Sequence, residues 1–329
     1  MRPGGEVVEE RADQDVHSHS SATKHIYTFV CHEDERELCE LELRTLLGVQ
    51  PQSSWAESAR CVDPGRSPFV KQRLDVLYES GSIEDIAAWA AGGVELAGAT
   101  FKVVAADADG RASYDELRAV ERAVGARIRG VADMREPARR LGLLRAGGRW
   151  VLGDARESGA AWLAHSAKPH SYSTALGVRV ARAVANIAVP DPAAGARAID
   201  PCCGIGTVLI EALAMGIDIV GCDINPLAVR GARGNLLHFG MPDIVRLADM
   251  RTLAGHYDAA VLDLPYNLCS RLSEEMRLEM LSSLRRLAAK AVVISTEEIA
   301  PSLGAAGFTV ADRCTARKGR FARYIYVCV

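Results

Sequence analysis

The sequence predicts an α/β protein whose C-terminal half is a doubly wound parallel sheet and whose N-terminal half is a smaller α+β domain. Three observations in the C-terminal half support this fold class. Short apolar runs alternate with helical stretches, successive runs end on or near an aspartate, and a glycine turn follows the first run and opens a helix. Carboxyl ends of parallel strands share one sheet edge, where such sheets bind ligands.

The totals limit the class of protein. A length of 329 residues suggests two domains, and 49% hydrophobic with 25% charged residues is ordinary for a soluble globular protein. No apolar run approaches the roughly 18 residues that span a bilayer, and the N-terminus lacks an apolar signal core. Nine cysteines without a Cys-x-x-Cys pair indicate neither a disulfide framework nor a zinc site. We therefore expect a cytoplasmic protein without a membrane contact or a metal.

The charge distribution restricts how nucleic acid would bind. The net charge is −3, and residues 1–23 hold two basic and five acidic side chains, so the rest of the chain is neutral overall. Any RNA contact must come from local basic clusters, which are otherwise solvated faces. Two clusters qualify: Arg127, Arg129, Arg135, Arg139, Arg140, Arg145 and Arg149, and near the C-terminus Arg313, Arg317, Lys318, Arg320 and Arg323.

The N-terminal half begins with a polar segment, residues 1–23, which we expect to be a disordered tail. A strand at 26–30, a helix at 35–47 that ends at Gly48, a loop at 50–68, a strand at 73–78 and a helix at 82–91 follow. A strand at 101–105 precedes a helix at 113–124, with Ser113 as N-cap and Glu116 three residues later. The runs 141–144 and 150–153 predict a hairpin.

In the C-terminal half, an amphipathic helix at 175–188 is expected to pack on the sheet, so we place the domain boundary before residue 165. Four strand-like runs follow, at 198–200, 219–223, 244–248 and 259–263. Helices are expected at 226–239 and 274–289, and a strand at 291–294. The runs 308–310 and 323–327 predict an antiparallel pair at the sheet edge.

The candidate site lies where these strands end. Gly204 and Gly206 follow the first strand, and a backbone without Cβ atoms lets a ligand approach closely. Asp223 comes about twenty residues after that turn, the spacing at which doubly wound folds place a carboxylate on ribose hydroxyls. A single aspartate commonly just ends a strand, but Asp200, Asp223, Asp249 and Asp263 form a series that favours a binding site.

This order resembles the class I S-adenosylmethionine-dependent methyltransferases, which have a Rossmann-like sheet. Asp263-Leu264-Pro265-Tyr266 is similar to the Asp/Asn-Pro-Pro-Tyr motif of the branch that methylates exocyclic or amide nitrogens. The segments 168–174 and 179–188 resemble the lead-in of the tRNA guanine-N2 methyltransferases of the guanosine-10 type. Those enzymes have a THUMP-bearing N-terminal half, and residues 24–164 resemble a degenerate THUMP-like module or an unrelated accessory domain.

The resemblance implies S-adenosyl-L-methionine as cofactor. It places the methionine part at Asp200, Gly204 and Gly206, the ribose hydroxyls at Asp223, and the adenine amino group at Asp249. Thr207 either borders the cofactor or caps the following helix. The full set of expected cofactor contacts is Asp200, Cys202, Gly204, Gly206, Thr207, Asp223, Ile224, Asp249, Met250 and Asp263.

The expected catalytic residues are Asp263, Pro265 and Tyr266. An aromatic amine is a poor nucleophile, so the Asp263 carboxylate and the carbonyl near Leu264 would accept its N–H bonds and help remove its proton. Tyr266 would stack on a flipped base. Leu264 stands where the family usually has proline, which predicts a looser loop.

The function expected from this resemblance is methylation of an exocyclic amine in RNA, with guanine N2 of tRNA preferred and RNA as the partner. A partner subunit is not indicated. The same tetrapeptide also serves N6-adenine DNA and glutamine-amide methyltransferases, and a non-catalytic RNA-binding protein that keeps the fold is a further alternative. Locating the transferred methyl group separates these possibilities.

Overall fold

The computed structural model describes residues 24–172, 175–265, 272–319 and 321–329. The N-terminal half forms a six-stranded sheet in the order β2-β1-β3-β6-β5-β4, in which only β4 and β5 run parallel. Its elements are β1 (His25–Phe29), η1 (Glu33–Glu35), α1 (Arg36–Leu47), β2 (Trp55–Ser58), β3 (Val70–Ser80), α2 (Ile83–Gly93), β4 (Phe101–Asp107), α3 (Tyr114–Gly125), β5 (Arg139–Ala146) and β6 (Arg149–Glu157).

The C-terminal half forms a seven-stranded sheet in the order β12-β13-β11-β10-β7-β8-β9. The strands from β11 to β9 are parallel, and β13 is antiparallel to both of its neighbours. The elements are η2 (Ala161–Ala167), α4 (Val178–Ala188), η3 (Pro192–Ala194), β7 (Arg197–Asp200), α5 (Thr207–Ala214), β8 (Asp218–Asp223), α6 (Pro226–His238), β9 (Val245–Leu247), η4 (Met250–Thr252), β10 (Tyr257–Asp263), α7 (Glu274–Leu287), β11 (Ala288–Ser295), α8 (Ala300–Ala305), β12 (Val310–Lys318) and β13 (Phe321–Cys328).

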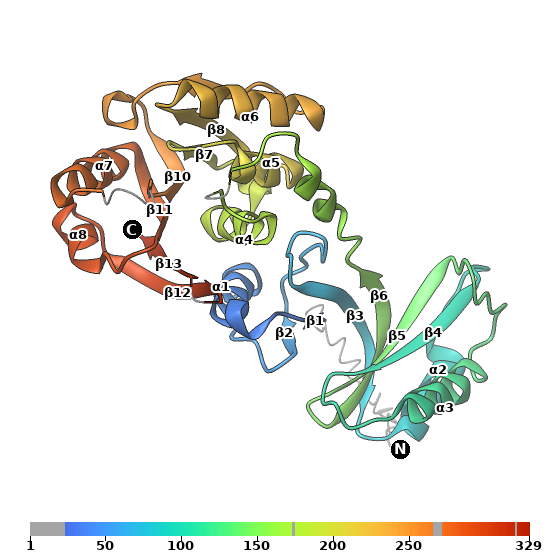
Figure 1. Cartoon of the computed structure of the whole chain (residues 1–329). Coiled ribbons are helices and arrows are strands. Elements are labelled where there is room, and N and C mark those ends of the chain that lie inside the picture. The colour runs from blue at the N-terminus through green and yellow to red at the C-terminus, as the bar shows by residue number, and fades with distance from the viewer. Residues whose placement is uncertain (1–23, 173–174, 266–271, 320) are drawn as a thin grey trace, which may run out of the picture.

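The seven-stranded sheet confirms the predicted α/β class with a Rossmann-like arrangement. Helices α4, α5 and α6 share one apolar core with one face of the sheet, and α7 and α8 share another with the opposite face (Figure 1). Chain order runs outward from β7 through β8 to β9, but β10 and β11 lie on the other side of β7. The strand order therefore reverses between β7 and β10, which is where such folds open a ligand crevice.

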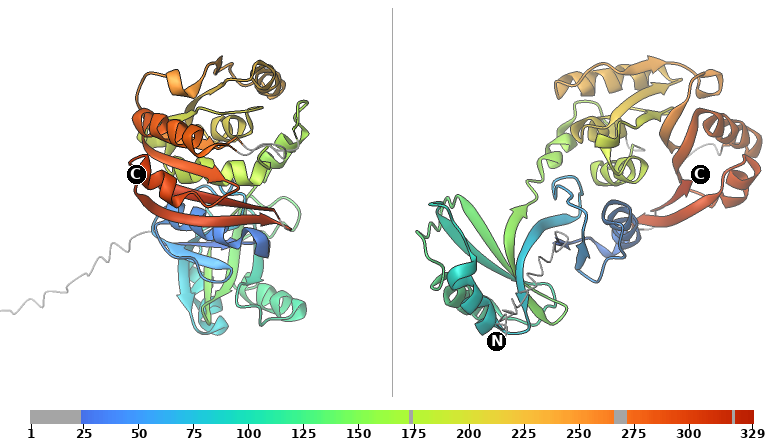
Figure 2. Two further views of the ribbon diagram at one scale, coloured as in Figure 1. Left: turned by 60° about the vertical axis from the view of Figure 1, so that its left-hand side comes forward. Right: turned by 180° about the vertical axis from the view of Figure 1, so that it is seen from behind.

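Helix α1 joins the two halves. It packs against α4 and β12 of the C-terminal half, so its apolar side chains belong to the same core as those of α4 (Figures 1 and 2). The guanidinium of Arg44 donates two hydrogen bonds of 2.8 Å to the Asp312 carboxylate. The expected packing of the helix that precedes the sheet is also confirmed, since α4 contacts β10 and β11.

A buried polar network, which we call the junction network, lies beside that apolar contact. In the C-terminal half, Glu211 accepts a 2.7 Å hydrogen bond from Arg182 and makes a 2.6 Å contact with His165. The network links this pair to α1 and to the loop before β3, because Arg182 also donates to the Arg66 carbonyl at 2.8 Å. Its members are Glu42, Arg66, Ser67, His165, Arg182, Asn186 and Glu211.

Local signals explain several element boundaries. Gly48 ends α1 with a φ of 72°, a left-handed conformation that glycine adopts without strain. Ser113 and Glu116 form the predicted capping box at the start of α3. The prediction of a loop over 50–68 was wrong in part, because β2 lies within it and pairs with β1. Within the described residues no helix is both long and apolar enough to cross a membrane.

Candidate active site

The carboxyl edge of the parallel strands brings the predicted aspartates together. Asp200, Asp223 and Asp263 are the last residues of β7, β8 and β10, and Asp249 follows β9 and caps η4 through a hydrogen bond from the Arg251 amide. Strands β7 and β10 are neighbours, so Asp200 and Asp263 flank the point where the strand order reverses. The four aspartates therefore lie along the carboxyl edge of the sheet, as the sequence predicted.

The two glycines of the turn have different surroundings: Gly204 borders open space, and Gly206 packs against α6. Gly204 has a φ of 52°, and apart from its chain neighbours no atom of the described residues lies within 4 Å of the place where a Cβ would stand. Its amide donates a 2.9 Å hydrogen bond to Asp223, which fixes the turn against β8. Gly206 has a φ of 81° and faces Ala232 of α6, 3.3 Å from its would-be Cβ. Gly206 packs against α6 and is not among the described residues that line the pocket, so its expected cofactor contact stays a prediction.

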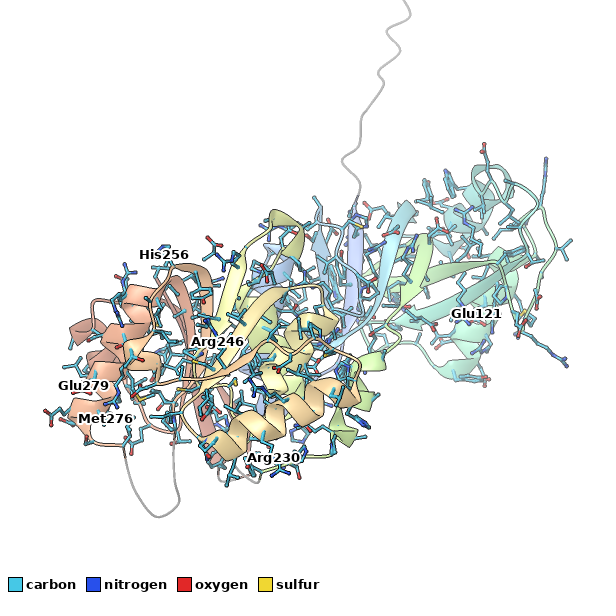
Figure 3. The ribbon with its side chains drawn as sticks, turned by 90° about the horizontal axis from the view of Figure 1, so that it is seen from above. Glu121, Arg230, Arg246, His256, Met276 and Glu279 are labelled. Atoms are coloured by element: carbon cyan, nitrogen blue, oxygen red, sulfur yellow. The ribbon has the colours of Figure 1, made fainter. Side chains whose placement is uncertain are left out.

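A pocket of about 590 Å³ lies above this edge. Its volume is within the usual range for small-molecule sites. Its lining includes the four aspartates and several apolar side chains, among them Met276 of α7, which is labelled in Figure 3. Other lining residues from the expected set are Cys202, Gly204, Thr207, Ile224, Met250 and Pro265, whereas Tyr266 lies outside the described residues.

Asp263 is the least satisfied acid in the pocket. Its Oδ1 atom is buried and has no hydrogen-bond partner within the described part of the chain. Burial raises the pKa of its carboxyl group to about 7, although the positive charge of Arg323 opposes the shift. Burial also raises the pKa of Asp200 well above its usual range, and the neighbouring Asp263 and Asp223 add to the effect. A ligand that donates hydrogen bonds or carries positive charge would stabilise the ionised form of both carboxyl groups and lower their pKa values.

A second buried polar atom without a hydrogen-bond partner in the described part of the chain belongs to Thr207. Its Oγ1 is buried and has no partner among the described residues, and it makes no capping bond at the start of α5, where Gly206 occupies the N-cap position. The alternative capping role of Thr207 is therefore not observed. Because Thr207 lines the pocket, its hydroxyl is available to a ligand there.

Asp249 is already engaged. Arg251 donates to both of its carboxylate oxygens, at distances from 2.7 to 3.1 Å, and this pairing holds the pKa of Asp249 below its usual value. Arg251 also reaches Glu279 of α7 at 3.0 Å, and Figure 3 shows Glu279 on the same helix as Met276. An adenine amino group at Asp249 would therefore have to use a remaining lone pair of a carboxylate that Arg251 orients.

Leu264 tightens the turn after β10, contrary to the expectation of a looser loop. Its amide donates a 2.9 Å hydrogen bond to the carbonyl of Ile294, which extends the pairing of β10 with β11. Its side chain is 4% exposed and packs in the apolar core that contains α7. Proline has no amide hydrogen, so the usual residue of the motif would lose this bond.

The segment before α4 is held by a residue that sequence reasoning missed. Asn235 of α6 is fully buried; its side chain accepts from the His170 amide at 2.9 Å and donates to the carbonyls of His170 and Ile205. Gly234 makes room for His170, because a Cβ there would lie 2.6 Å from the imidazole Nε2. The same segment brings Tyr172 to the pocket. An asparagine on a helix is a weak sequence signal, since its partners lie far away in the chain.

Other chemistries find little support. Across the described ranges, no group of three or more histidine, cysteine, aspartate or glutamate side chains is arranged to hold a metal ion. Cys202 contacts the Met250 sulfur at 3.5 Å, and burial raises the pKa of its thiol well above the usual range. A thiol held in its protonated form is a poor nucleophile.

Comparison with known proteins supports the methyltransferase assignment. Residues 166–300 match a family model described as "RMKL-like, methyltransferase domain". The chain is 37% identical over 130 residues to a tRNA (guanine(10)-N2)-dimethyltransferase of Methanothermobacter thermautotrophicus, which is 36% of this chain and 38% of that protein. It is 30% identical over 173 residues to the enzyme of the same name from Pyrococcus abyssi, covering 49% of this chain and 51% of that protein.

The chain thus spans about half the length, or less, of these curated relatives. Among solved structures, TrmN from Thermus thermophilus aligns over 93% of this chain and 99% of its own, with 18% identity and a TM-score of 0.48. The resemblance to guanine-N2 methyltransferases that the motifs predicted is confirmed over the aligned residues, and residues 166–300 are similar to a methyltransferase domain.

Proposed function

We propose that this protein transfers a methyl group from S-adenosyl-L-methionine to the exocyclic N2 of guanine in RNA, with tRNA as the preferred substrate. The observation that carries the proposal is the buried Oδ1 of Asp263, which has no hydrogen-bond partner among the described residues and lies where the strand order reverses. The names of the relatives support guanine N2 as the target atom. A cytoplasmic location belongs to the same proposal.

The pocket fits this cofactor by size and by chemistry. A volume of about 590 Å³ accommodates a nucleoside with an amino-acid chain, and the four aspartates in the lining suit a ligand with a sulfonium and an ammonium group. Asp223 keeps free lone pairs for ribose hydroxyls beside the bonds it accepts from the amides of Gly204 and Asn225. The backbone of Gly204 and the hydroxyl of Thr207 face the methionine part. When bound, the cofactor supplies an electrophilic methyl group.

The residues of the chain orient the acceptor and manage its proton. The Asp263 carboxylate accepts one N–H bond of the guanine amine, and the carbonyl of Leu264 accepts the other. These two bonds turn the nitrogen lone pair toward the pocket. Because Leu264 is fixed to Ile294 through its own amide, the two acceptors keep a constant separation. After transfer, Asp263 holds the released proton at its Oδ1. Tyr266, which lies outside the described residues, has the proposed role of stacking on the base.

The N-terminal half, residues 24–164, is proposed to hold the RNA while residues 165–329 transfer the methyl group. In the first arginine cluster, Arg139, Arg140 and Arg149 are paired with acids in the six-stranded sheet. By contrast, the side chains of Arg127, Arg129 and Arg135 are exposed and form no ion pair within the described residues. These three favour a phosphate contact on the loop between α3 and β5, in a THUMP-like role.

The experiment is a methyl-transfer assay with labelled cofactor and three acceptors: unmodified tRNA transcripts, double-stranded DNA and a protein extract. Nucleoside mass spectrometry of the RNA identifies the product. We expect N2-methylguanosine or its dimethylated form. Label in N6-methyladenine of DNA or in protein would contradict the proposal. Cofactor binding without transfer to any acceptor would favour a non-catalytic RNA-binding protein instead.

A further inference from the structure

The hairpin formed by β12 and β13 extends past the edge that bears the candidate site. Ile294 of β11 pairs with Asp263 on one side and with Ile325 of β13 on the other. Because β13 runs antiparallel to β11, its earlier residues lie beyond the carboxyl edge. Arg323 precedes Ile325 by two residues, so it shares the face of Asp263 and lies about 7 Å further out. The influence of Arg323 on the pKa of Asp263 agrees with this closeness.

The outer end of the hairpin combines cations with an aromatic ring. Lys318 pairs with Phe321, so the two side chains lie on one face, and Arg317 lies on the other. Both cations are exposed, and neither makes an ion pair or side-chain hydrogen bond within the described residues. Phe321 is 37% exposed, and the guanidinium of Arg323 lies over its ring, 4.8 Å from the centroid. We call Arg317, Lys318 and Phe321 the hairpin tip.

The base of the hairpin is fixed to α1. Besides the Arg44–Asp312 ion pair, Glu37 accepts a 2.8 Å hydrogen bond from the Thr315 amide, and Cys314 and Ala316 are buried. Acidic η1 also contacts β12, but within the described residues its carboxylates form no ion pair with Arg317 or Lys318. The cations at the tip are therefore held by a rigid support and remain available to a partner.

We propose that the hairpin tip binds the RNA strand beside the target guanine: Phe321 stacks on a neighbouring base, and Arg317 and Lys318 contact the flanking phosphates. A base that leaves the stack for Asp263 deprives its neighbours of a stacking partner. A flat ring replaces that contact for any base, and cations on either side of the ring track the backbone. This inference rests on the proposed function and adds a second RNA contact, next to the chemistry and distant in sequence from residues 24–164.

The test measures binding of unmodified tRNA transcripts by filter retention at several salt concentrations. The double variant R317E/K318E is compared with wild type and with R246E, a single charge reversal on exposed β9 at the opposite edge of the sheet (Figure 3). We expect the double variant to bind about ten-fold more weakly, with a salt slope smaller by about 2. R246E should bind like wild type. Equal binding by the double variant and R246E would overturn the inference.

Stacking is tested separately at Phe321. Phe321→Leu keeps an apolar side chain without a flat face and should weaken RNA binding about ten-fold, whereas Phe321→Trp should retain it. Equal losses in both variants would indicate a packing role and contradict stacking. Affinity for S-adenosylhomocysteine should be unchanged in every variant, which excludes misfolding. Wild-type protein that binds the cofactor but no RNA refutes both proposals, whereas normal RNA methylation by the tip variants refutes only this one.

Discussion

The junction network and the pocket both contain buried carboxylate groups, and their surroundings differ in one respect. In the junction network, Glu211 lies between His165 and Arg182, and Glu42 accepts hydrogen bonds from Ser67 and Asn186. In the pocket, Asp263 keeps a buried oxygen without a partner among the described residues. A buried acid with partners stabilises a contact between elements, whereas one without partners costs folding free energy unless a ligand completes it. The presence or absence of hydrogen-bond partners therefore distinguishes acids that stabilise the fold from an acid that is available to a ligand.

Replacement of the pocket acid Asp263 should have the largest effect, and this effect should be on catalysis. Asp263→Asn keeps the shape but cannot accept a proton or offer a second acceptor oxygen. We expect the turnover number for RNA methylation to fall about 10²- to 10⁴-fold. Affinity for S-adenosylhomocysteine, measured by calorimetry, should stay within a few-fold of wild type. Retained turnover in this variant would remove Asp263 from the mechanism.

The corresponding change in the junction network should affect stability instead. Glu211→Gln leaves the guanidinium of Arg182 buried without its carboxylate, and we expect the free energy of unfolding in urea to drop by about 3 kcal/mol. Glu274→Gln on α7 is the control, because its side chain is 93% exposed and its loss should cost under about 0.5 kcal/mol. Similar values for the two variants would mean that the network does not stabilise the contact between the halves.

The unpartnered acid should also give a pH-dependent stability difference. The pKa of Asp263 is about 7 in the folded protein, against about 3.9 in an unfolded chain. Between these values the folded state holds a proton that the unfolded state has released, so stability falls as pH rises through this window. The Asp263→Asn variant has no carboxyl group at this position, so its stability does not fall for this reason as the pH rises. We expect equal stability of variant and wild type near pH 4 and an advantage for the variant on the order of 4 kcal/mol at pH 8.

Melting temperatures across this pH range measure that difference. The comparison between variant and wild type also cancels the contribution of Glu42, whose pKa burial likewise raises to about 7. A difference that does not change between pH 4 and pH 8 would show that Asp263 is satisfied in solution.

The smallest expected effect concerns the turn beside Asp263. Leu264→Pro restores the usual motif residue but removes the hydrogen bond from the amide to Ile294. We expect a loss of about 1 kcal/mol in the free energy of unfolding and a methylation rate within a few-fold of wild type. Leu264→Ile keeps the amide and serves as the control. A proline variant as stable as wild type would show that the bond contributes nothing.

The sequence predicted the features that local patterns determine. The strand ends locate Asp200, Asp223 and Asp263, since a parallel sheet collects its carboxyl ends at one edge. The capping signals of α1 and α3 also act within a few residues. Such features require no knowledge of which segments meet in space.

Features that depend on distant partners were not predicted. Strand β2 has few residues and buries only Ala56 and Ser58, and its pairing comes from β1. Gly206 matches a ligand-turn pattern, yet α6 lies against it. The role of Asn235 depends on two carbonyls from other segments, and the Leu264 bond depends on β11. Only the assembled fold reveals these contacts.

Binding of S-adenosyl-L-methionine at the aspartate-lined edge is best tested by calorimetric titration with S-adenosylhomocysteine. We expect one site per chain in the wild type, with binding weakened at least about ten-fold by Asp223→Ala, because the ribose hydroxyls and the glycine turn both lose an acceptor. Absence of binding by folded wild-type protein, or unchanged binding by the Asp223 variant, would contradict this expectation.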